Sequence, residues 1–215
     1  MEMWNAFLSQ LLETTAIEFL AVVTGIASVW FSKQEKILVY PFGIISVGLY
    51  IFITYQYKLY ADTGINAYYL LMSLYGWYNW KNTKIGADQI PITSSTKKGN
   101  IFNVSIMLAA FFLLWILLSQ NTDSDVPMWD ALTTSFAITA MYLMAQKKIE
   151  HWYFWIGTNI SSIPLYIYKE LPFTSFQFIV FGYIAVLGLI SWRQKMLIGD
   201  HETDVNIRPT TDDLN

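Results

Sequence analysis

The sequence predicts an all-α integral membrane protein with seven transmembrane helices, arranged as two parallel three-helix repeats joined by a linker helix (3+1+3). Of the 215 residues, 54% are hydrophobic and 13% are charged, which is too apolar for a domain whose whole surface faces water. Seven apolar stretches are each long enough to cross about 30 Å of hydrocarbon as a helix. The third stretch is also repeated in the seventh, which indicates an internal duplication.

The composition excludes several classes of protein. A net charge of -3 provides no overall positive field to attract nucleic acid, so no nucleic-acid partner is expected. The chain has no cysteine and only two histidines, His151 and His201, which excludes disulfides, thiolate metal sites and cysteine nucleophiles. The sequence therefore predicts no cofactor and no metal, and its expected environment is the lipid bilayer.

The first 15 residues predict a short amphipathic helix on the membrane surface. Its apolar residues follow helical spacing on one face and are Trp4, Phe7, Leu8, Leu11 and Leu12. Acidic residues stand where a secretory leader would carry positive ones, so we expect this segment to be retained.

Charged or turn residues bound each of the seven apolar stretches. The stretches lie near residues 16–32, 37–56, 62–80, 101–119, 130–146, 152–168 and 174–192. Seven spans place the two termini on opposite sides of the membrane. The fourth stretch is almost uniformly apolar, as expected of a linker helix that faces lipid.

The lysines and arginines predict which side is cytoplasmic. Eleven of the 13 fall on the side of the C-terminus and two, Lys58 and Lys169, on the other. The eleven are Lys33, Lys36, Lys81, Lys84, Lys97, Lys98, Lys147, Lys148, Arg193, Lys195 and Arg208. The positive-inside rule then predicts an outside N-terminus and a cytoplasmic C-terminus.

These assignments divide the chain into six segments. They are a surface helix (1–15), the first three-helix repeat (16–82), a cytoplasmic loop (83–100), the linker transmembrane helix (101–119), the second three-helix repeat (129–193) and a polar cytoplasmic tail (199–215), which we expect to be disordered.

The duplication is clearest between residues 57–81 and 168–193. The matched pairs are Leu59 with Leu171, Asp62 with Thr174, Gly76 with Gly188, Trp80 with Trp192 and Lys81 with Arg193. Because three helices and one linker precede the second copy, both copies share one orientation and are related by an axis along the membrane normal. Substrate sites of such folds lie at the interface of the repeats, near the midplane.

Two stripes of aromatic and hydrogen-bonding residues predict a binding site. One follows 3-4-3-4 spacing from Trp152 to Tyr166, and the other runs along the span 62–80. Aromatic faces and amides on one inward face are typical of a binding wall. The predicted substrate-binding residues are Asn66, Tyr69, Ser73, Trp77, Trp152, Trp155, Asn159, Tyr166 and Gln177.

Each of these residues also has a structural interpretation. Small polar groups commonly make interhelical hydrogen bonds, which would assign the stripe to helix packing. Tryptophans near span ends form interfacial belts, and we assign Trp4, Trp30, Trp80, Trp129 and Trp192 to such a belt. Pro164 predicts a kink or flexible joint.

The acidic residues of the spans lie at their outer ends. Asp62 and Asp130 are placed as helix caps, with Thr174 equivalent to Asp62, and Glu18 lies at a similar depth. No charged residue stands in the middle of a span, so the usual proton relay or ion-coupling site is missing and energised transport is disfavoured.

Four motifs carry a resemblance to a known family. They are PFGIIS (41–46), YKLYAD (57–62), YGWYNW (75–80) and the W-x2-W-x3-N run at 152–159. Together they resemble the PnuC family of bacterial vitamin transporters over residues 16–193. The resemblance implies a 3+1+3 fold akin to that of the SWEET sugar carriers, a vitamin bound inside the bundle, and facilitated diffusion with trapping by cytoplasmic phosphorylation.

The resemblance also implies a cargo and partners. The best-known members carry nicotinamide riboside, which links them to a cytoplasmic nicotinamide riboside kinase, and relatives take thiamine or riboflavin. Nicotinamide riboside is a flat cation that aromatic faces can hold by stacking and cation-π attraction, while Asn and Gln can pair with its amide and hydroxyls. A bacterial inner-membrane location and a homo-oligomer, with a trimer as one state, are also implied.

Two other classes compete with a carrier. A membrane enzyme needs a nucleophile, a metal cluster or an acid/base pair inside the bundle, and the sequence offers none, so no enzyme is expected. A non-transporting receptor or scaffold would keep the binding stripe, and the sequence alone does not separate it from a carrier.

Overall fold

The computed structural model describes residue 4 and residues 7–9, 15–81 and 90–207. In this part of the chain, seven helices have 18 residues or more. They are α2 (Ala16–Lys33), α3 (Val39–Gln56), α4 (Tyr60–Lys81), α5 (Lys97–Asn121), α6 (Pro127–Ala145), α7 (His151–Tyr168) and α8 (Pro172–Ile207). The all-α class and the order of the seven predicted stretches are confirmed.

The last helix corrects one expectation. α8 continues to Ile207, whereas the sequence predicted a disordered tail from residue 199. No proline interrupts the chain between Pro172 and Pro209, and adding residues to an existing helix avoids the cost of nucleation. Polarity alone was therefore a poor guide to disorder over residues 199–207.

Within the described residues, four helices are long and apolar enough to cross a membrane by length and composition, namely α2, α3, α5 and residues 172–198 of α8. The other three, α4, α6 and α7, have 22, 19 and 18 residues, which is also sufficient length. Their lower apolarity reflects the polar side chains that they carry toward the interior of the bundle.

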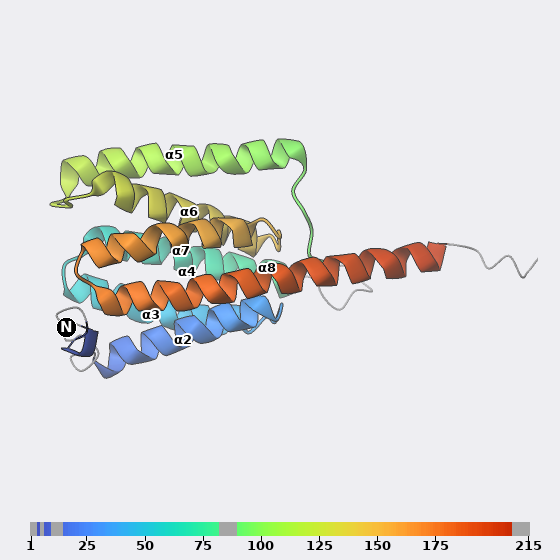
Figure 1. Ribbon diagram of the computed structural model, residues 1–215, viewed down its shortest axis with the longest axis horizontal. Helices are drawn as coiled ribbons and strands as arrows, with labels where there is room; N and C mark the ends of the chain where they lie inside the picture. The colour runs from blue at the N-terminus through green and yellow to red at the C-terminus, as the bar shows by residue number, and fades with distance from the viewer. Residues whose placement is uncertain (1–3, 5–6, 10–14, 82–89, 208–215) are drawn as a thin grey trace, which may run out of the picture.

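Six of the helices form a closed ring. α2 packs on α3, α3 on α4, α4 on α6, α6 on α7 and α7 on α8, and α8 returns to α2. α5 lies outside the ring against α6, as the green helix at the edge of Figure 1 shows. The contact of α4 with α6 and that of α8 with α2 are equivalent under an exchange of the two repeats, as two parallel three-helix units require.

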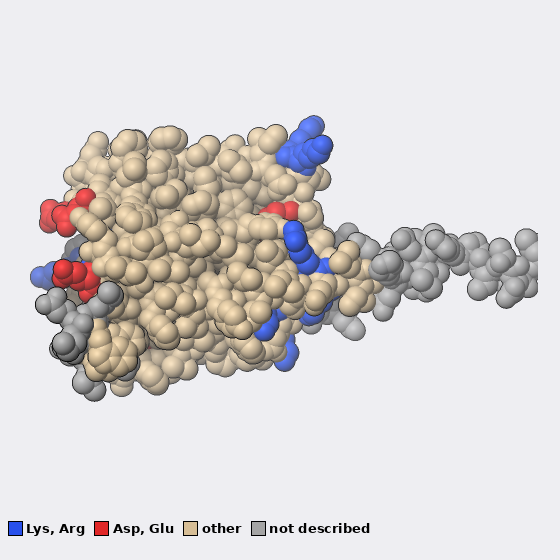
Figure 2. All heavy atoms as spheres, viewed as in Figure 1, with Lys and Arg blue, Asp and Glu red and all other residues tan. Residues whose placement is uncertain are grey.

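The two ends of the bundle differ in charge. Figure 2 shows lysine and arginine side chains gathered at one end, while acidic side chains dominate the other. We call the first the basic end; it holds the last turn of α2 and the first turn of α5. We call the second the acidic end; it holds the first turns of α2, α4 and α6.

The short turns inside the repeats share one backbone geometry. Each contains a single non-glycine residue in the left-handed region: Glu35 (φ 65°), Lys58 (φ 58°), Lys147 (φ 56°) and Glu170 (φ 58°). The following residue donates its backbone N–H to a carbonyl five positions earlier, in the bonds Lys36 to Phe31, Leu59 to Thr54, Lys148 to Leu143 and Leu171 to Tyr166. This Schellman arrangement normally uses glycine, and a side chain there costs about 1–2 kcal/mol. The duplication therefore extends to the backbone of the turns.

An ion cluster joins the two repeats at the basic end. The buried Lys147 Nζ lies 2.7 Å from Glu35 Oε1, and Lys195 Nζ lies 2.8 Å from Glu35 Oε2. Lys147 Nζ also donates to the Ile90 carbonyl at 2.6 Å and lies 4.8 Å from the centre of the Trp80 ring. Glu35 and Lys147 occupy equivalent turns of the two repeats, so this pair spans their interface.

The environment of the pair shifts both pKa values. Burial alone would raise the pKa of Glu35, but the hydrogen bonds and charges of Lys147 and Lys195 outweigh it and lower that pKa below its ordinary value. Burial lowers the pKa of Lys147, and the Glu35 carboxylate offsets this only in part.

The segment between the repeats is partly docked on the second one. Residues 82–89 of the predicted loop (83–100) lie outside the described residues. Thr93 pairs with Lys148, and the Glu150 carboxylate accepts hydrogen bonds from the Ser94 hydroxyl and the Ser95 N–H, both at 2.7 Å. Because α5 begins at Lys97, the predicted loop ends earlier than the sequence indicated.

The predicted surface helix (1–15) lies largely outside the described residues. Residues 4 and 7–9 are helical, and the Phe7 ring packs against Phe173 and Phe176 in the first turns of α8, with ring centres 5.7 and 5.9 Å apart. This part of the segment therefore contacts the second repeat at the acidic end.

The ion cluster predicts a pH-dependent contribution to stability. Replacing Glu35→Gln leaves the buried Lys147 ammonium without its carboxylate, which we expect to cost about 3 kcal/mol of unfolding free energy and to lower the melting temperature in detergent. Because the folded pKa of Glu35 is lowered, its contribution is complete above the unfolded value of 4.5 and is lost as pH falls through the folded pKa.

The control is Lys195→Gln, which removes the more exposed partner and should cost about 1 kcal/mol or less. The difference in melting temperature between wild type and Glu35→Gln should be full at pH 7 and should shrink in acid. A difference that is independent of pH would contradict the assigned role of the carboxylate.

Candidate functional site

A cavity of about 460 Å³ lies inside the ring of helices. All six ring helices contribute to its lining, and α5 contributes none of it. A volume of this size suits a small organic ligand. The axis that relates the two repeats passes through the same interior, so the position agrees with that predicted from the duplication.

Eight of the nine predicted binding residues line this cavity. They are Asn66, Tyr69, Ser73, Trp152, Trp155, Asn159, Tyr166 and Gln177. The 3-4-3-4 stripe of α7 faces the cavity over its full length, because Ser162 also belongs to the lining. The helical spacing of the two stripes thus located residues from α4 and α7 at one cavity, and Gln177 of α8 joins them.

Trp77 is the exception. It is 38% exposed and lies outside the lining. On this turn of α4 the inward positions are Gly76, which lies against Tyr40, and the buried Trp80, so Trp77 faces outward. The stripe of α4 therefore faces the cavity only from Asn66 to Ser73.

Two asparagines supply amide groups to the cavity. Asn159 Nδ2 donates to the Trp155 carbonyl at 2.7 Å, and Asn66 Nδ2 donates to the Asp62 carbonyl at 2.9 Å. Each bond holds the side chain against its own helix and leaves the carboxamide oxygen as an acceptor for a ligand. Thr158 likewise donates to its own helix, at the Phe154 carbonyl.

Aromatic residues that the stripes did not include complete the wall. Tyr50 from α3 and Phe178 and Phe181 from α8 line the cavity, and the Phe178 ring stacks on Tyr166 with centres 5.1 Å apart. In a chain with 17% aromatic residues, such side chains are not distinguishable from lipid-facing ones by type alone.

Small residues bring α2 and α3 close together beside the cavity. A Cβ added at Gly25 would lie 3.0 Å from the Ser46 hydroxyl, and one added at Gly43 would lie 3.0 Å from the Ser28 hydroxyl. Ser28 and Ser46 donate to carbonyls of the opposite helix at 2.7 and 2.8 Å. The matching Gly-x-x-Ser spacing of both helices was a signal available in the sequence.

Four rings close the cavity toward the basic end, and we call them the aromatic floor: Tyr40, Trp80, Trp152 and Trp192. Tyr40 meets Trp80 edge-on at 5.2 Å, and Trp152 meets Trp192 edge-on at 5.8 Å, so each repeat supplies one such pair. The two pairs meet where Trp80 and Trp192 lie 6.0 Å apart.

The floor corrects the predicted interfacial belt. Trp80 and Trp192 are buried, and they donate their indole N–H groups to the carbonyls of Met144 (3.1 Å) and Ser32 (3.0 Å). Assigning these two tryptophans to the belt was therefore wrong. Both lie near span ends as predicted, but they face inward. Each indole N–H adds a second hydrogen bond to a carbonyl that already accepts a backbone N–H, from Lys147 at Met144 and from Glu35 at Ser32.

The other three belt tryptophans are placed differently. Trp4 and Trp30 are exposed, in agreement with the belt interpretation. Trp129 donates its indole N–H to the Ser161 carbonyl at 3.0 Å and so joins α6 to α7.

The prediction that Asp62 and Asp130 cap their helices is wrong, and the capping carboxylate of this end is Glu18. That residue forms a capping box with Thr15, whereas Asp62 and Asp130 lie inside the first turns of their helices. Asp130 accepts hydrogen bonds from Lys169 at 2.5 Å and from Ser124 at 2.6 Å. Asp62 lines the cavity and is the one charged residue among its described lining.

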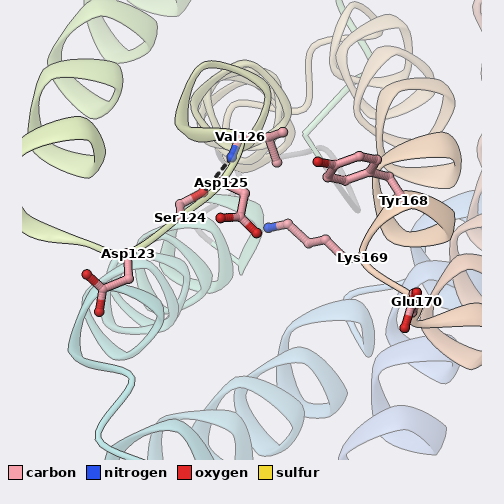
Figure 3. Close-up of a pocket in the computed structure, with 7 residues that line it drawn as sticks. All are labelled: Asp123, Ser124, Asp125, Val126, Tyr168, Lys169 and Glu170. Atoms are coloured by element: carbon pink, nitrogen blue, oxygen red, sulfur yellow. Dashed lines mark hydrogen bonds between the residues drawn. The ribbon is translucent and has the colours of Figure 1, made fainter.

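A second hollow of about 490 Å³ lies on the surface at the acidic end. Its lining comes from residues 123–126 and 168–170, and Figure 3 shows Lys169 extending from the α7–α8 turn toward the 123–126 loop. Charged and backbone groups dominate this hollow, and Tyr168 supplies its one aromatic ring. The cavity inside the ring is the better candidate for a site that recognises a flat organic ligand.

Comparison with known proteins agrees with this geometry. The family model described as nicotinamide mononucleotide transporter matches residues 15–194. The chain belongs to this transporter family. Its matched range agrees closely with the resemblance over residues 16–193 that the sequence motifs indicated.

Several members of the family are similar over most of the chain. The nicotinamide riboside transporter PnuC of Escherichia coli (strain K12) is 24% identical over 201 residues, covering 82% of this chain and 84% of the relative. That of Neisseria mucosa is 28% identical over 187 residues, covering 80% and 70%. The riboflavin/roseoflavin transporter RibM of Streptomyces davaonensis is 23% identical over 178 residues, covering 79% and 81%.

A solved structure of the family supports the fold. The crystal structure of the vitamin B3 transporter PnuC superposes with a TM-score of 0.69 at 25% sequence identity, covering 89% of this chain and 87% of that one. The transmembrane, all-helical architecture of the family is therefore shared by this chain.

The aromatic floor predicts that Trp192 matters mainly for stability. Trp192→Ala removes a fully buried ring and the hydrogen bond to Ser32, and we expect a loss of about 3–5 kcal/mol of unfolding free energy. Thermal unfolding in detergent measures the effect. The matched control is Trp30→Ala, which removes an exposed indole and should change the melting temperature little; equal losses in both variants would contradict the assignment of Trp192 to the core.

Proposed function

We propose that the chain carries nicotinamide riboside across the bacterial cytoplasmic membrane. The main support is the α7 stripe, whose tryptophans and asparagine line the cavity of a chain that belongs to this transporter family. Relatives named as nicotinamide riboside transporters match about four fifths of the chain, which favours this cargo over other vitamins.

The lining suits the chemistry of nicotinamide riboside. Trp152, Trp155 and Tyr166 offer faces on which a pyridinium ring can stack with cation-π attraction. The carboxamides of Asn159, Asn66 and Gln177 offer donors and acceptors for the cargo's amide and ribose hydroxyls. Thiamine and riboflavin remain the competing cargoes, and the similarity to a riboflavin/roseoflavin transporter makes riboflavin the stronger of the two.

We further propose transport by facilitated diffusion. Among the described residues that line the cavity, Asp62 alone carries a charge, and it lies in the first turn of α4 rather than at mid-span. A largely neutral cage holds a cation weakly enough to release it, whereas a central carboxylate would slow release. Net uptake then comes from a cytoplasmic kinase that phosphorylates the cargo, so the chain itself acts as a carrier and not as an enzyme.

The orientation follows from the partition of charge. The 11 to 2 distribution of lysine and arginine favours a cytoplasmic basic end, with the N-terminus outside and the C-terminus inside. The cavity would then be closed on the cytoplasmic side by the aromatic floor. We also expect the chain to form a homo-oligomer, with a trimer as one state, as the resemblance to the family implies.

Flux into vesicles reconstituted with the protein tests the function. Labelled nicotinamide riboside should enter saturably and equilibrate with the outside, and dissipating a proton or sodium gradient should leave the final level unchanged. Trp155→Ala and Asn159→Leu should each weaken binding of nicotinamide riboside by about 1–3 kcal/mol, or roughly 5- to 150-fold, because a stacking face or a polar partner is lost.

Trp77→Ala is the matched control, since it removes an indole of the α4 stripe that lies outside the cavity. It should leave affinity nearly unchanged, and melting temperatures measured in parallel separate loss of binding from loss of folding. Unaltered affinity in both Trp155→Ala and Asn159→Leu would show that the α7 stripe serves helix packing and does not bind the cargo. Stronger competition by riboflavin than by unlabelled nicotinamide riboside would overturn the assignment of the cargo.

Cysteine labelling in intact cells tests the orientation. The chain has no native cysteine, so single cysteines at Lys98 and Asn121, at opposite ends of α5 and both exposed, can be labelled without background. Asn121→Cys should react with an impermeant maleimide and Lys98→Cys should not. The reverse pattern would invert the assigned topology.

A further inference from the structure

Gly188 of α8 lies directly against the indole of Trp152. A Cβ added at this glycine would lie 2.5 Å from Cη2 and Cζ2 and 2.7 Å from Cε2 of that ring. Real carbon atoms do not approach so closely without contact strain. The ring can therefore occupy its present position only because residue 188 has no side chain.

The indole of Trp152 has little room to retreat from such a contact. Its side chain is buried, with the Trp192 ring at 5.8 Å and the His151 ring at 4.3 Å. His151 is itself fixed by a 2.7 Å hydrogen bond between Nδ1 and the Lys148 carbonyl. The side of Trp152 that remains open is the one that lines the cavity.

The equivalent glycine of the first repeat, Gly76, also packs directly against an aromatic ring. A Cβ added at Gly76 would lie 2.5 Å from Cε1 and from the hydroxyl oxygen of Tyr40. Tyr40 is as buried as Trp152, but it does not belong to the cavity lining. The two glycines thus create the same local packing, and only the one in the second repeat supports a ring that faces the cavity.

We propose that Gly188 is a positioning residue of the cargo site, and this inference rests on the proposed function. Because Gly188 has no side chain, the Trp152 indole can pack directly against its backbone. This packing fixes the position of the indole in the aromatic floor and so the boundary of the cavity at that end. A methyl group at this position pushes the indole toward the cargo, which reduces the space and tilts the stacking face.

Four variants test the proposal by binding of nicotinamide riboside and by vesicle flux. Gly188→Ala should weaken affinity at least 10-fold, mainly as a rise in KM. Gly76→Ala is the matched control and should change affinity less than 2-fold, even where its melting temperature falls as much. Trp152→Phe removes the atoms that meet the added methyl, so Gly188→Ala combined with Trp152→Phe should bind no more weakly than Trp152→Phe alone.

A measurement without cargo separates this inference from the proposed function. The chain contains nine tryptophans, and after incorporation of 5-fluorotryptophan the fluorine resonance that Trp152→Phe removes identifies Trp152. That resonance should shift in Gly188→Ala and stay in place in Gly76→Ala. Failure of the wild type to bind nicotinamide riboside would overturn the function, whereas an unmoved resonance in Gly188→Ala would overturn the positioning role.

The remaining outcomes are also decisive. A shifted resonance with unchanged affinity means that the position of Trp152 does not matter to the cargo, which overturns the proposal. Equal loss of affinity in Gly188→Ala and Gly76→Ala overturns it as well, because a general packing defect would explain both. If Gly188→Ala does not fold, recovery of folding and of Trp152→Phe affinity in the double variant supports it.

Discussion

The arrangement of the bundle depends on two indole N–H groups that reach across the interface of the repeats. Trp80, from the first repeat, donates to the last turn of α6, and Trp192, from the second, donates to the last turn of α2. Each of the two carbonyls also accepts a backbone N–H from the turn that follows, so the indole occupies its second acceptor position. The same two bonds join the two repeats of the six-helix ring and bring the four aromatic side chains of the floor together. The floor then closes the cavity at the basic end.

Interior polarity follows from the same constraint. Most polar side chains of the ring first satisfy their own helix, as Asn159, Asn66 and Thr158 do through carbonyls one turn earlier. Helices can therefore carry polar groups through the membrane without binding one another tightly through them. The least apolar helices, α4, α6 and α7, form much of the wall of the central cavity and bring these polar side chains to it.

The sequence predicted the all-α class and the order of the seven apolar stretches, because periodicity and length are set by helix geometry and by the thickness of the hydrocarbon layer. Eight of the nine residues predicted to bind substrate line one cavity, and their role in binding stays a prediction. Trp80 and Trp192 were misassigned because depth along a helix is readable from sequence, whereas the direction in which an isolated indole faces depends on its neighbours. Trp77 lies outside the cavity for a related reason: the sequence does not show that Gly76 and Trp80, and not Trp77, take the inward positions on that turn. The docking of residues 92–95 on the α6–α7 turn was not visible in a segment that reads as a polar loop.

The pairing of Glu35 with Lys147 favours assembly of the first repeat with the second repeat of the same chain. The residues occupy equivalent turns and meet across the axis that relates the repeats. A symmetric dimer of two first halves would place the Glu35 residues of both copies against each other. A symmetric dimer of two second halves would do the same with their Lys147 residues. Like charges at a buried contact repel strongly, so neither half can substitute for the other. The opposite charges at this turn therefore favour pairing of the first half with the second over pairing of either half with a copy of itself.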